Sequence, residues 1–306
     1  MTNYKEVEDH FIDKYRDKFN LLILTATKVE KEVLHENMTP LPGQTEILEI
    51  KNKKYTYYIG VFGAFYAVHV SCNEMGSMGR NSSAITAVDG IETWAPSVAL
   101  MVGIAFGADK KKQKIGDVLI SERILPYDPK RVGKEETVSR GKEGPASSLL
   151  LDRYKSITGW DFNHENGIPK IITGLILSGE TLLDNTPLKK QMIKEHPEAI
   201  GGEMEGPGIY AACDGRVNDW ILVKGICDWA DGNKKKDKDK YQKMAIDSAV
   251  ALSSLVFNKP LSFKDVALVA QNEVLKTDFT EEKGGIPEWM KDQEKTLAKE
   301  IRNEDR

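Results

Sequence analysis

The sequence predicts an α/β protein with a mixed, largely parallel twisted sheet that is flanked by helices. Short, predominantly apolar runs such as NLLILTAT (20–27) and SVALMVGIA (97–105) are typical of strands buried on both faces. Segments of helical periodicity follow such runs, as KVEKEVLHE (28–36) does. This alternation indicates strands joined by helices that cover the sheet.

The elements can be placed in order along the chain. Residues 44–50 and 54–63 are separated by a short polar turn and form a predicted hairpin. Residues 126–145 form a long polar excursion with no clear element. Further strands are expected over 65–72, 116–124, 169–179, 199–203 and 219–228. Helices are expected over 4–18, 28–36, 81–94, 146–154, 187–196 and 240–257.

The chain divides into three predicted parts. Residues 1–19 are expected to form an N-terminal helix, and residues 20–258 a single α/β domain. Residues 259–306 are charged and weakly patterned, so they are expected to form a helical or partly disordered extension.

Composition excludes several classes of protein. A formal net charge of −4 gives no global basic field for nucleic acid. The three cysteines have no metal-site spacing and suggest no disulfide framework. The first residues are too charged for a signal peptide, and charged residues and a proline interrupt the longest apolar stretch, so no membrane span is expected. A reducing, cytoplasmic setting fits best.

The segment AIGGEMEGPGIYAAC (199–213) places two glutamates at the junction of an apolar strand and a helix. On an extended chain, Glu203 and Glu205 would point to the same side. The positive end of the helix dipole accounts well for one carboxylate there and poorly for two. Ligands of parallel sheets bind beyond the carboxyl ends of strands, where this segment lies.

Four strand ends, taken in order, resemble the purine nucleoside phosphorylase and uridine phosphorylase superfamily. They are VGIAFGADKKKQKIGDVLIS, GLILSGETLLDN, GGEMEG and ICDWAD, and the resemblance extends from about Leu21 to Phe257. The resemblance implies a nucleoside phosphorylase-like fold. Within the superfamily, the chain resembles the methylthioadenosine/S-adenosylhomocysteine nucleosidases. The residues of these motifs most closely resemble those of bacterial antiviral effectors that cleave the glycosidic bond of ATP.

The resemblance assigns roles to five residues. It implies that Asp228 is the acid, because at the end of an apolar strand partial burial would help it hold a proton for the purine N7. A helix cap or a salt bridge with Lys224 is the alternative for Asp228. Glu205, with Met204 and Glu203 beside it, would bind the ribose hydroxyls. Glu30 would activate water, with Glu32 as the alternative and an exposed helix charge as the non-catalytic interpretation.

The base pocket and the nucleophile follow from the same resemblance. Leu182, Leu183, Phe106, Ile104 and Ser178 are expected around the base. The phosphorylases hold phosphate where this chain has Glu30, Met101 and Ile104, and a carboxylate with two apolar groups cannot bind a phosphate dianion. Water is therefore the expected nucleophile.

A triphosphate would require cations near the cavity. The glycine-rich loop with Gly76, Ser77 and Arg80 offers backbone N–H groups at a helix start. The polar excursion supplies Lys130, Arg131 and Arg140. The lysine runs at 110–112 and 234–240 are interpreted as solvated surface. No metal site is expected and no cofactor is required, although Mg²⁺ would accompany a nucleotide.

Four functions remain open on the sequence. The leading one is hydrolysis of ATP to adenine and ribose triphosphate, as an antiviral effector. The others are a methylthioadenosine/S-adenosylhomocysteine nucleosidase, a phosphate-dependent purine nucleoside phosphorylase, and a non-catalytic nucleotide-binding module. The family implies a homo-oligomer, a dimer or a hexamer, and the effector reading leaves room for a regulatory protein partner.

Overall fold

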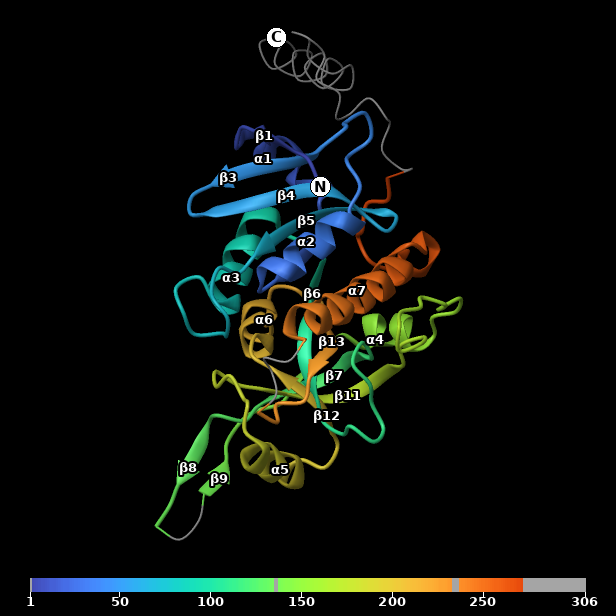
Figure 1. Ribbon diagram of the computed structural model, residues 1–306. Coiled ribbons are helices and arrows are strands. Elements are labelled where there is room, and N and C mark those ends of the chain that lie inside the picture. The colour runs from blue at the N-terminus through green and yellow to red at the C-terminus, as the bar shows by residue number, and fades with distance from the viewer. Residues whose placement is uncertain (1, 135–136, 233–236, 272–306) are drawn as a thin grey trace, which may run out of the picture.

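A single large sheet runs through the protein, as the computed structural model shows for residues 2–134, 137–232 and 237–271 (Figure 1). The strands are β1 (Tyr4–Val7), β2 (Leu21–Thr25), β3 (Ile47–Asn52), β4 (Tyr55–Phe62), β5 (Phe65–Ser71), β6 (Val98–Gly107), β7 (Val118–Pro126), β8 (Lys130–Val132), β9 (Thr137–Ser139), β10 (Gly144–Pro145), β11 (Ile171–Ser178), β12 (Ala199–Glu203) and β13 (Asp219–Asp228). The helices are α1 (His10–Tyr15), α2 (Lys28–Asn37), α3 (Ser83–Trp94), α4 (Ser148–Lys155), α5 (Thr186–Glu195), α6 (Gly206–Cys213) and α7 (Lys238–Phe257), with short 3₁₀ turns at Arg16–Lys18 and Pro260–Phe263.

The sheet has 11 strands in the order β1-β3-β4-β5-β2-β6-β12-β11-β7-β10, and β13 pairs with both β6 and β7. Strands β6, β12, β11, β7 and β13 therefore form a closed ring of paired strands. Parallel pairs such as β2–β5 and β13–β6 occur beside antiparallel ones such as β3–β4. The predicted mixed α/β sheet and the hairpin are confirmed.

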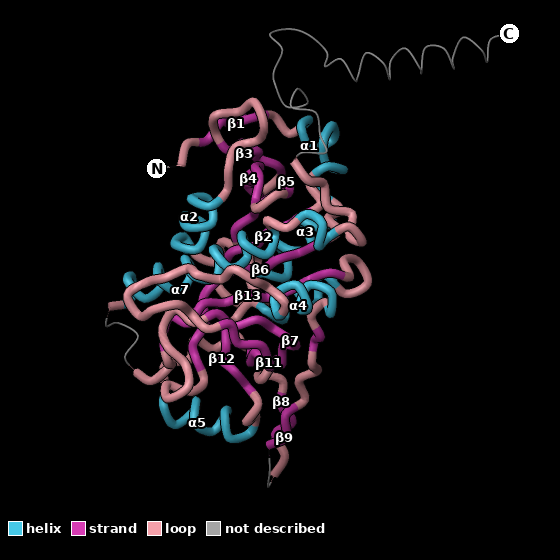
Figure 2. The backbone as a smooth tube through the Cα atoms, turned by 90° about the vertical axis from the view of Figure 1, so that its right-hand side faces the viewer, coloured by secondary structure: helices cyan, strands magenta, loops and turns pink. Residues whose placement is uncertain are grey.

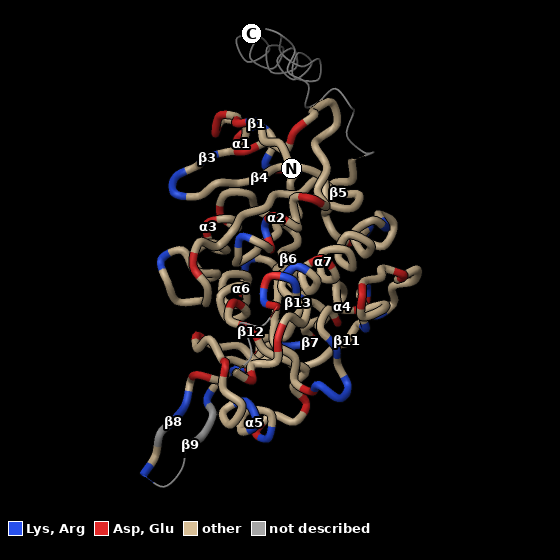
Figure 3. The backbone as a smooth tube through the Cα atoms, viewed as in Figure 1, with Lys and Arg blue, Asp and Glu red and all other residues tan. Residues whose placement is uncertain are grey.

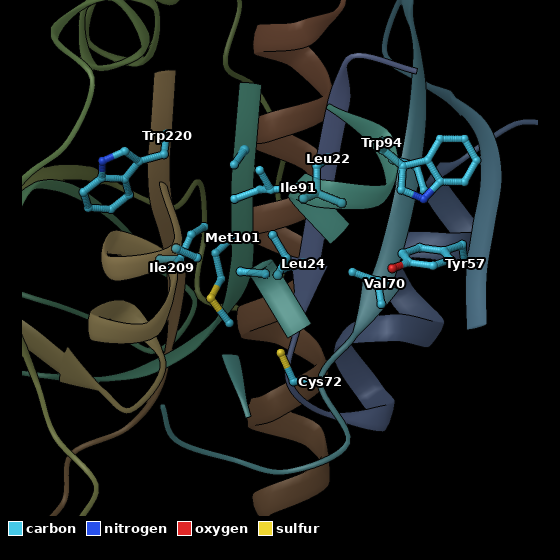
Figure 4. Close-up of a cluster of buried hydrophobic side chains, with 14 of the residues drawn as sticks. Leu22, Leu24, Tyr57, Val70, Cys72, Ile91, Trp94, Met101, Ile209 and Trp220 are labelled. Atoms are coloured by element: carbon cyan, nitrogen blue, oxygen red, sulfur yellow. The ribbon is translucent and has the colours of Figure 1, made fainter. Parts of the chain in front are cut away.

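Both faces of the sheet are buried at β2, where residues 21–24 are apolar and all five positions are buried. Leu22 and Leu24 face α3 and α6, and Figure 4 shows them in the same cluster as Ile91 of α3. Leu21 and Ile23 alternate with them and pack with residues of α2 and α7. Figure 2 shows α2 and α7 on one side of the sheet and α3 on the other.

The N-terminal segment differs from the sequence prediction. The helix expected over 4–18 is wrong for residues 4–7, which form β1 and pair in parallel with β3, Tyr4 lying opposite Ile47. Helix α1 is confined to His10–Tyr15. Residues 4–7 alternate between exposed and half-buried positions, so pairing with an existing sheet edge outweighs weak local helix preference.

Two further segments carry more structure than expected. The polar excursion contains the β8–β9 hairpin, which projects from the body beside α5 (Figure 1). The packed domain continues past residue 258, where the extension was expected to begin. Phe263, Val266 and Leu268 are buried, and Ala270 forms a β-bridge with Phe65. The rest of the expected extension lies outside the described residues. Among the described helices, none is both long enough and apolar enough to cross a membrane.

Candidate active site

A cavity of about 350 Å³ opens where several strands of the sheet end. Strands β6, β12 and β13 contribute residues at or just beyond their carboxyl ends, and α2 follows the end of β2. This is the position that parallel sheets offer to ligands. The predicted site residues that line it are Asp228, Glu30, Glu205, Met204, Glu203, Leu182, Leu183, Phe106 and Ile104.

Three buried carboxylates gather around one buried lysine. Lys224 has no exposed surface and lies in the middle of the apolar strand β13. Its Nζ is 2.9 Å from Oε2 of Glu205 and 3.3 Å from Oε2 of Glu203. A Cβ atom on Gly103 would lie 2.6 Å from Oε1 of Glu30 and 2.9 Å from this Nζ, so glycine makes room for both groups. The cluster combines sequence segments from four parts of the chain.

Glu203 is the carboxylate that binds the positive, N-terminal end of helix α6. Its oxygens accept hydrogen bonds from the backbone N–H groups of Glu205, at 2.8 Å, and Gly206, at 3.0 Å, and from the hydroxyl of Ser178. With Lys224 alongside, the roughly four acceptor positions of a carboxylate are filled. Burial raises the pKa of Glu203, and Lys224 opposes that rise. Glu203 therefore holds the start of α6, and Ser178 holds Glu203 without lining the cavity.

Glu205 keeps acceptor positions free on the cavity side. Oε1 accepts the backbone N–H of Gly76 at 3.2 Å, and Oε2 accepts Lys224. Burial alone would raise the pKa of Glu205, but the charge and hydrogen bond of Lys224 outweigh it and the pKa is lowered. Glu205 is thus an ionised carboxylate with about two unused acceptor positions, which suits a pair of vicinal hydroxyls.

The expectation that Glu203 and Glu205 share a face of an extended chain is wrong in detail. Strand β12 ends at Glu203, and Glu205 already has a helical backbone (φ −105°, ψ −18°). Both carboxylates meet at Lys224 because the chain turns between them.

Backbone N–H groups just after β2 and within β6 hold Glu30. Its Oε2 accepts the N–H groups of Ala26 at 2.7 Å and Thr27 at 2.8 Å, and its Oε1 accepts that of Ile104 at 2.9 Å. Thr27 and Glu30 also form a capping box that starts α2. Three of about four acceptor positions are filled, so Oε1 retains one. Burial raises the pKa of Glu30, with Lys224 opposing, as suits a base that must exchange protons near neutrality.

Asp228 ends β13 and is half-buried. Its Oδ1 accepts the backbone N–H of Ala230 at 2.7 Å, and the thiol of Cys227 donates to Oδ2 at 3.3 Å. The register with β6 shifts between Ile226 and Asp228. This bulge breaks the strand parity that would have aligned Asp228 with Lys224, and Lys224 pairs with the two glutamates instead.

The apolar wall of the cavity is formed by Phe106, Ile104, Leu182 and Leu183. Phe106 and Leu183 are buried, whereas Leu182 is 57% exposed. A Cβ on Gly202 would lie 2.4 Å from Cζ of Phe106, so glycine at this position lets the ring pack against β12. A flat apolar group fits beside this ring.

Two N–H groups of the glycine-rich loop are engaged by carboxylates of the chain. The N–H of Gly76 donates to Glu205, and the N–H of Ser77 donates to Glu180 at 2.8 Å. Arg80 is exposed and does not line the cavity. Carboxylates of the chain itself occupy the expected anion site.

The other predicted cations lie away from the cavity. Lys130 and Arg131 belong to β8, and Arg140 follows β9. All three are exposed, and none lines the cavity. Figure 3 shows the β8–β9 hairpin, with its basic residues, projecting from the body.

Sequence reasoning missed four residues at or beside the cavity. Lys224 was considered only as a partner of Asp228, although a lysine inside an apolar strand demands buried acidic partners. Thr27 was missed, although Thr27-x-x-Glu30 is a capping-box spacing. Lys238 and Gln242 of α7 also line the cavity. Lys238 is exposed, in keeping with the interpretation of the 234–240 run as solvated surface, and it also borders the cavity. Lys234, Lys235 and Lys236 lie outside the described residues. In the described ranges, no three His, Cys, Asp or Glu side chains are grouped as metal ligands.

The family model of the phosphorylase superfamily matches residues 20–256. The chain belongs to this superfamily. A death domain-containing ATP nucleosidase of Amphimedon queenslandica is 28% identical over 251 residues, covering 76% of this chain and 47% of the relative. The ATP nucleosidase Cap17 of Escherichia coli (strain KTE188) is 27% identical over 182 residues, covering 50% of this chain and 35% of the relative. The chain thus spans less than half the length of these two curated relatives.

Solved structures of superfamily members share the fold. The crystal structure of 5′-methylthioadenosine/S-adenosylhomocysteine nucleosidase from Neisseria meningitidis, in complex with methylthio-immucillin-A, matches with a TM-score of 0.63. The match covers 78% of this chain and 98% of that chain at 19% sequence identity.

Proposed function

We propose that this superfamily member is a nucleosidase that hydrolyses the N-glycosidic bond of ATP to adenine and ribose triphosphate. The observation that carries the proposal is the joint presence, in one cavity, of Asp228, an ionised Glu205 and a backbone-held Glu30. The names of two relatives, both ATP nucleosidases, support the choice of substrate.

Each of these groups has a defined task in the reaction. The bond between the purine and ribose C1′ breaks, its electron pair goes to the base, and Asp228 gives a proton to the purine N7. Glu205 accepts hydrogen bonds from the ribose hydroxyls, and its charge favours the positive charge that develops on the sugar. Water bonds to C1′ and gives a proton to Oε1 of Glu30.

Water is favoured over phosphate as the nucleophile by the charges beside Glu30. Lys224 is already paired with Glu203 and Glu205. Ile104 is apolar, and Met101 is buried. A phosphate dianion bound there would lie beside a buried carboxylate, while the neighbouring Lys224 is already engaged, which is unfavourable.

The second candidate is a methylthioadenosine/S-adenosylhomocysteine nucleosidase. Met75 and Leu182 line the cavity and are 54% and 57% exposed, so they offer apolar surface to a thioether. Action as an antiviral effector belongs to the leading proposal and rests on the sequence resemblance alone.

The proposal is tested by chromatography with mass detection after incubating the protein with ATP, AMP, methylthioadenosine or S-adenosylhomocysteine, with and without phosphate. Adenine and ribose triphosphate from ATP, at a rate indifferent to phosphate, are expected. Adenine from the thioethers alone would favour the second candidate. Dependence on phosphate would identify a phosphorylase, and intact substrates throughout would contradict the proposal.

A further inference from the structure

Several acidic side chains and one lysine line the described part of the cavity. Glu203, Glu205 and Glu30 are buried beside Lys224. Lys238, by contrast, is exposed and lines the same cavity from the first turn of α7. The polar side chain of Gln242 lies one helical turn further and lines the cavity too, so both residues present the same side of α7.

Lys238 is not committed to an acidic partner within the described ranges of the chain. The neighbouring lysines of α7 are committed: Lys240 Nζ lies 2.7 Å from Oε2 of Glu165, and Lys243 Nζ lies 2.9 Å from Oδ1 of Asp247. These two pairs form on the outer surface and do not line the cavity. Lys238 is thus available to a ligand where its neighbours on the helix are not.

The other cationic groups considered for phosphate lie elsewhere. Arg80 and the β8–β9 hairpin do not line the cavity, and the N–H groups of Gly76 and Ser77 bind glutamates. Among the described lining residues, Lys238 is the one lysine or arginine.

We propose that Lys238 and Gln242 bind the 5′ phosphate groups of the substrate and so select a nucleotide polyphosphate over a nucleoside. This inference rests on the proposed function. Lysine supplies three donors and a full positive charge to phosphate oxygens, and the glutamine amide supplies two neutral donors. Glu205 and Phe106 are left to the sugar and the base.

The test compares Lys238→Met with Lys240→Met, a lysine of the same helix that does not line the cavity. The measured quantity is kcat/KM for adenine release from ATP, ADP, AMP and adenosine. Because a hydrogen bond to a charged group is worth about 1.5–3 kcal/mol, Lys238→Met should lose about tenfold or more on ATP and little on adenosine. Lys240→Met should match the unchanged protein on all four. Gln242→Leu should also lose more kcat/KM on ATP than on adenosine, with a smaller loss than Lys238→Met.

Equal losses on ATP and adenosine, or no loss on ATP, would overturn the inference. Calorimetric titration with ATP separates this outcome from failure of the proposed function. Weaker ATP binding by Lys238→Met in a protein that releases no adenine would uphold the phosphate site and reject the nucleosidase. Adenine release from ATP, with equal ATP binding by Lys238→Met and Lys240→Met, would uphold the nucleosidase and reject the phosphate site.

Discussion

Lys224 Nζ lies 2.9 Å from Oε2 of Glu205, and both groups are buried at the floor of the candidate active site. Removing the lysine would leave Glu205 and Glu203 as unpaired buried carboxylates. Lys224→Met is therefore expected to lower the free energy of unfolding by about 3–5 kcal/mol. Urea denaturation followed by circular dichroism measures this.

A double variant separates charge from packing at this pair. In Lys224→Met/Glu205→Gln one unpaired charge is removed, so part of the lost stability should return. A double variant as unstable as the sum of the two single variants would show that the pair does not interact in this way.

The pH dependence of catalysis should report Glu30. A base must be deprotonated, and burial raises the pKa of Glu30, so kcat/KM should fall on the acid side at a pH above the ordinary glutamate value of about 4.3. Glu30→Gln preserves a capping box and should lower the rate by about 10²–10⁴-fold, with the acid limb lost. An unchanged acid limb in Glu30→Gln would assign that limb to another group.

Much of the fold could be predicted because β2, β6 and β13 are predominantly apolar runs with helices or turn signals around them. Strand β1 was missed because Tyr4–Val7 is charged and pairs with a strand more than 40 residues away. The hydrogen bonds from the glycine-rich loop to two glutamates were missed for a similar reason. Its acceptors, Glu205 and Glu180, lie 129 and 103 residues from Gly76 and Ser77 respectively, and local sequence carries no trace of such contacts.

The candidate site was predicted where motif and chemistry coincide and missed where they do not. Asp228, Glu205 and Glu30 follow strand ends and line one cavity. Lys238 belongs to a run of lysines, and nothing local distinguishes the one that lines the cavity from those on the surface.

Gly202 is expected to set the position of the Phe106 ring. Gly202→Ala would bring a Cβ to 2.4 Å from Cζ of Phe106, so the ring must move. The expected cost is about 1–3 kcal/mol of stability, with a higher KM for the nucleotide. Phe106→Leu frees space, so Gly202→Ala/Phe106→Leu should be less destabilised than the sum of the single variants. Strict additivity would contradict the clash.

Two buried histidines should make the protein sensitive to mild acid. His35 Nε2 lies 2.8 Å from Nδ1 of His69, whose Nε2 lies 2.9 Å from Oγ1 of Thr25. Burial lowers the pKa of His35 to about 3, with Lys31 adding to the effect, and burial with His35 lowers that of His69. The Tyr4 hydroxyl lies 2.8 Å from Nδ1 of His35, and the Tyr58 ring packs against both histidines.

The sign follows from linkage. The unfolded chain binds protons to these histidines below about pH 6.5 and the folded protein does not, so stability is full above that pH and falls as the pH drops toward 3. His35 alone should contribute about 2 kcal/mol of this loss by pH 5. His35→Gln should flatten the curve of unfolding free energy against pH, whereas exposed His10→Gln should leave it unchanged. Equal slopes for the two variants would contradict this account.

Adenine release from ATP in phosphate-free buffer, by the unchanged protein and by Asp228→Asn, tests the central claim most directly. The account predicts adenine and ribose triphosphate in equal amounts from the unchanged protein. It also predicts a rate at least about 10²-fold lower for Asp228→Asn, with ATP binding retained, because the acid is lost while the cavity persists. Intact ATP, phosphate loss in place of adenine, or undiminished adenine release by Asp228→Asn would contradict it.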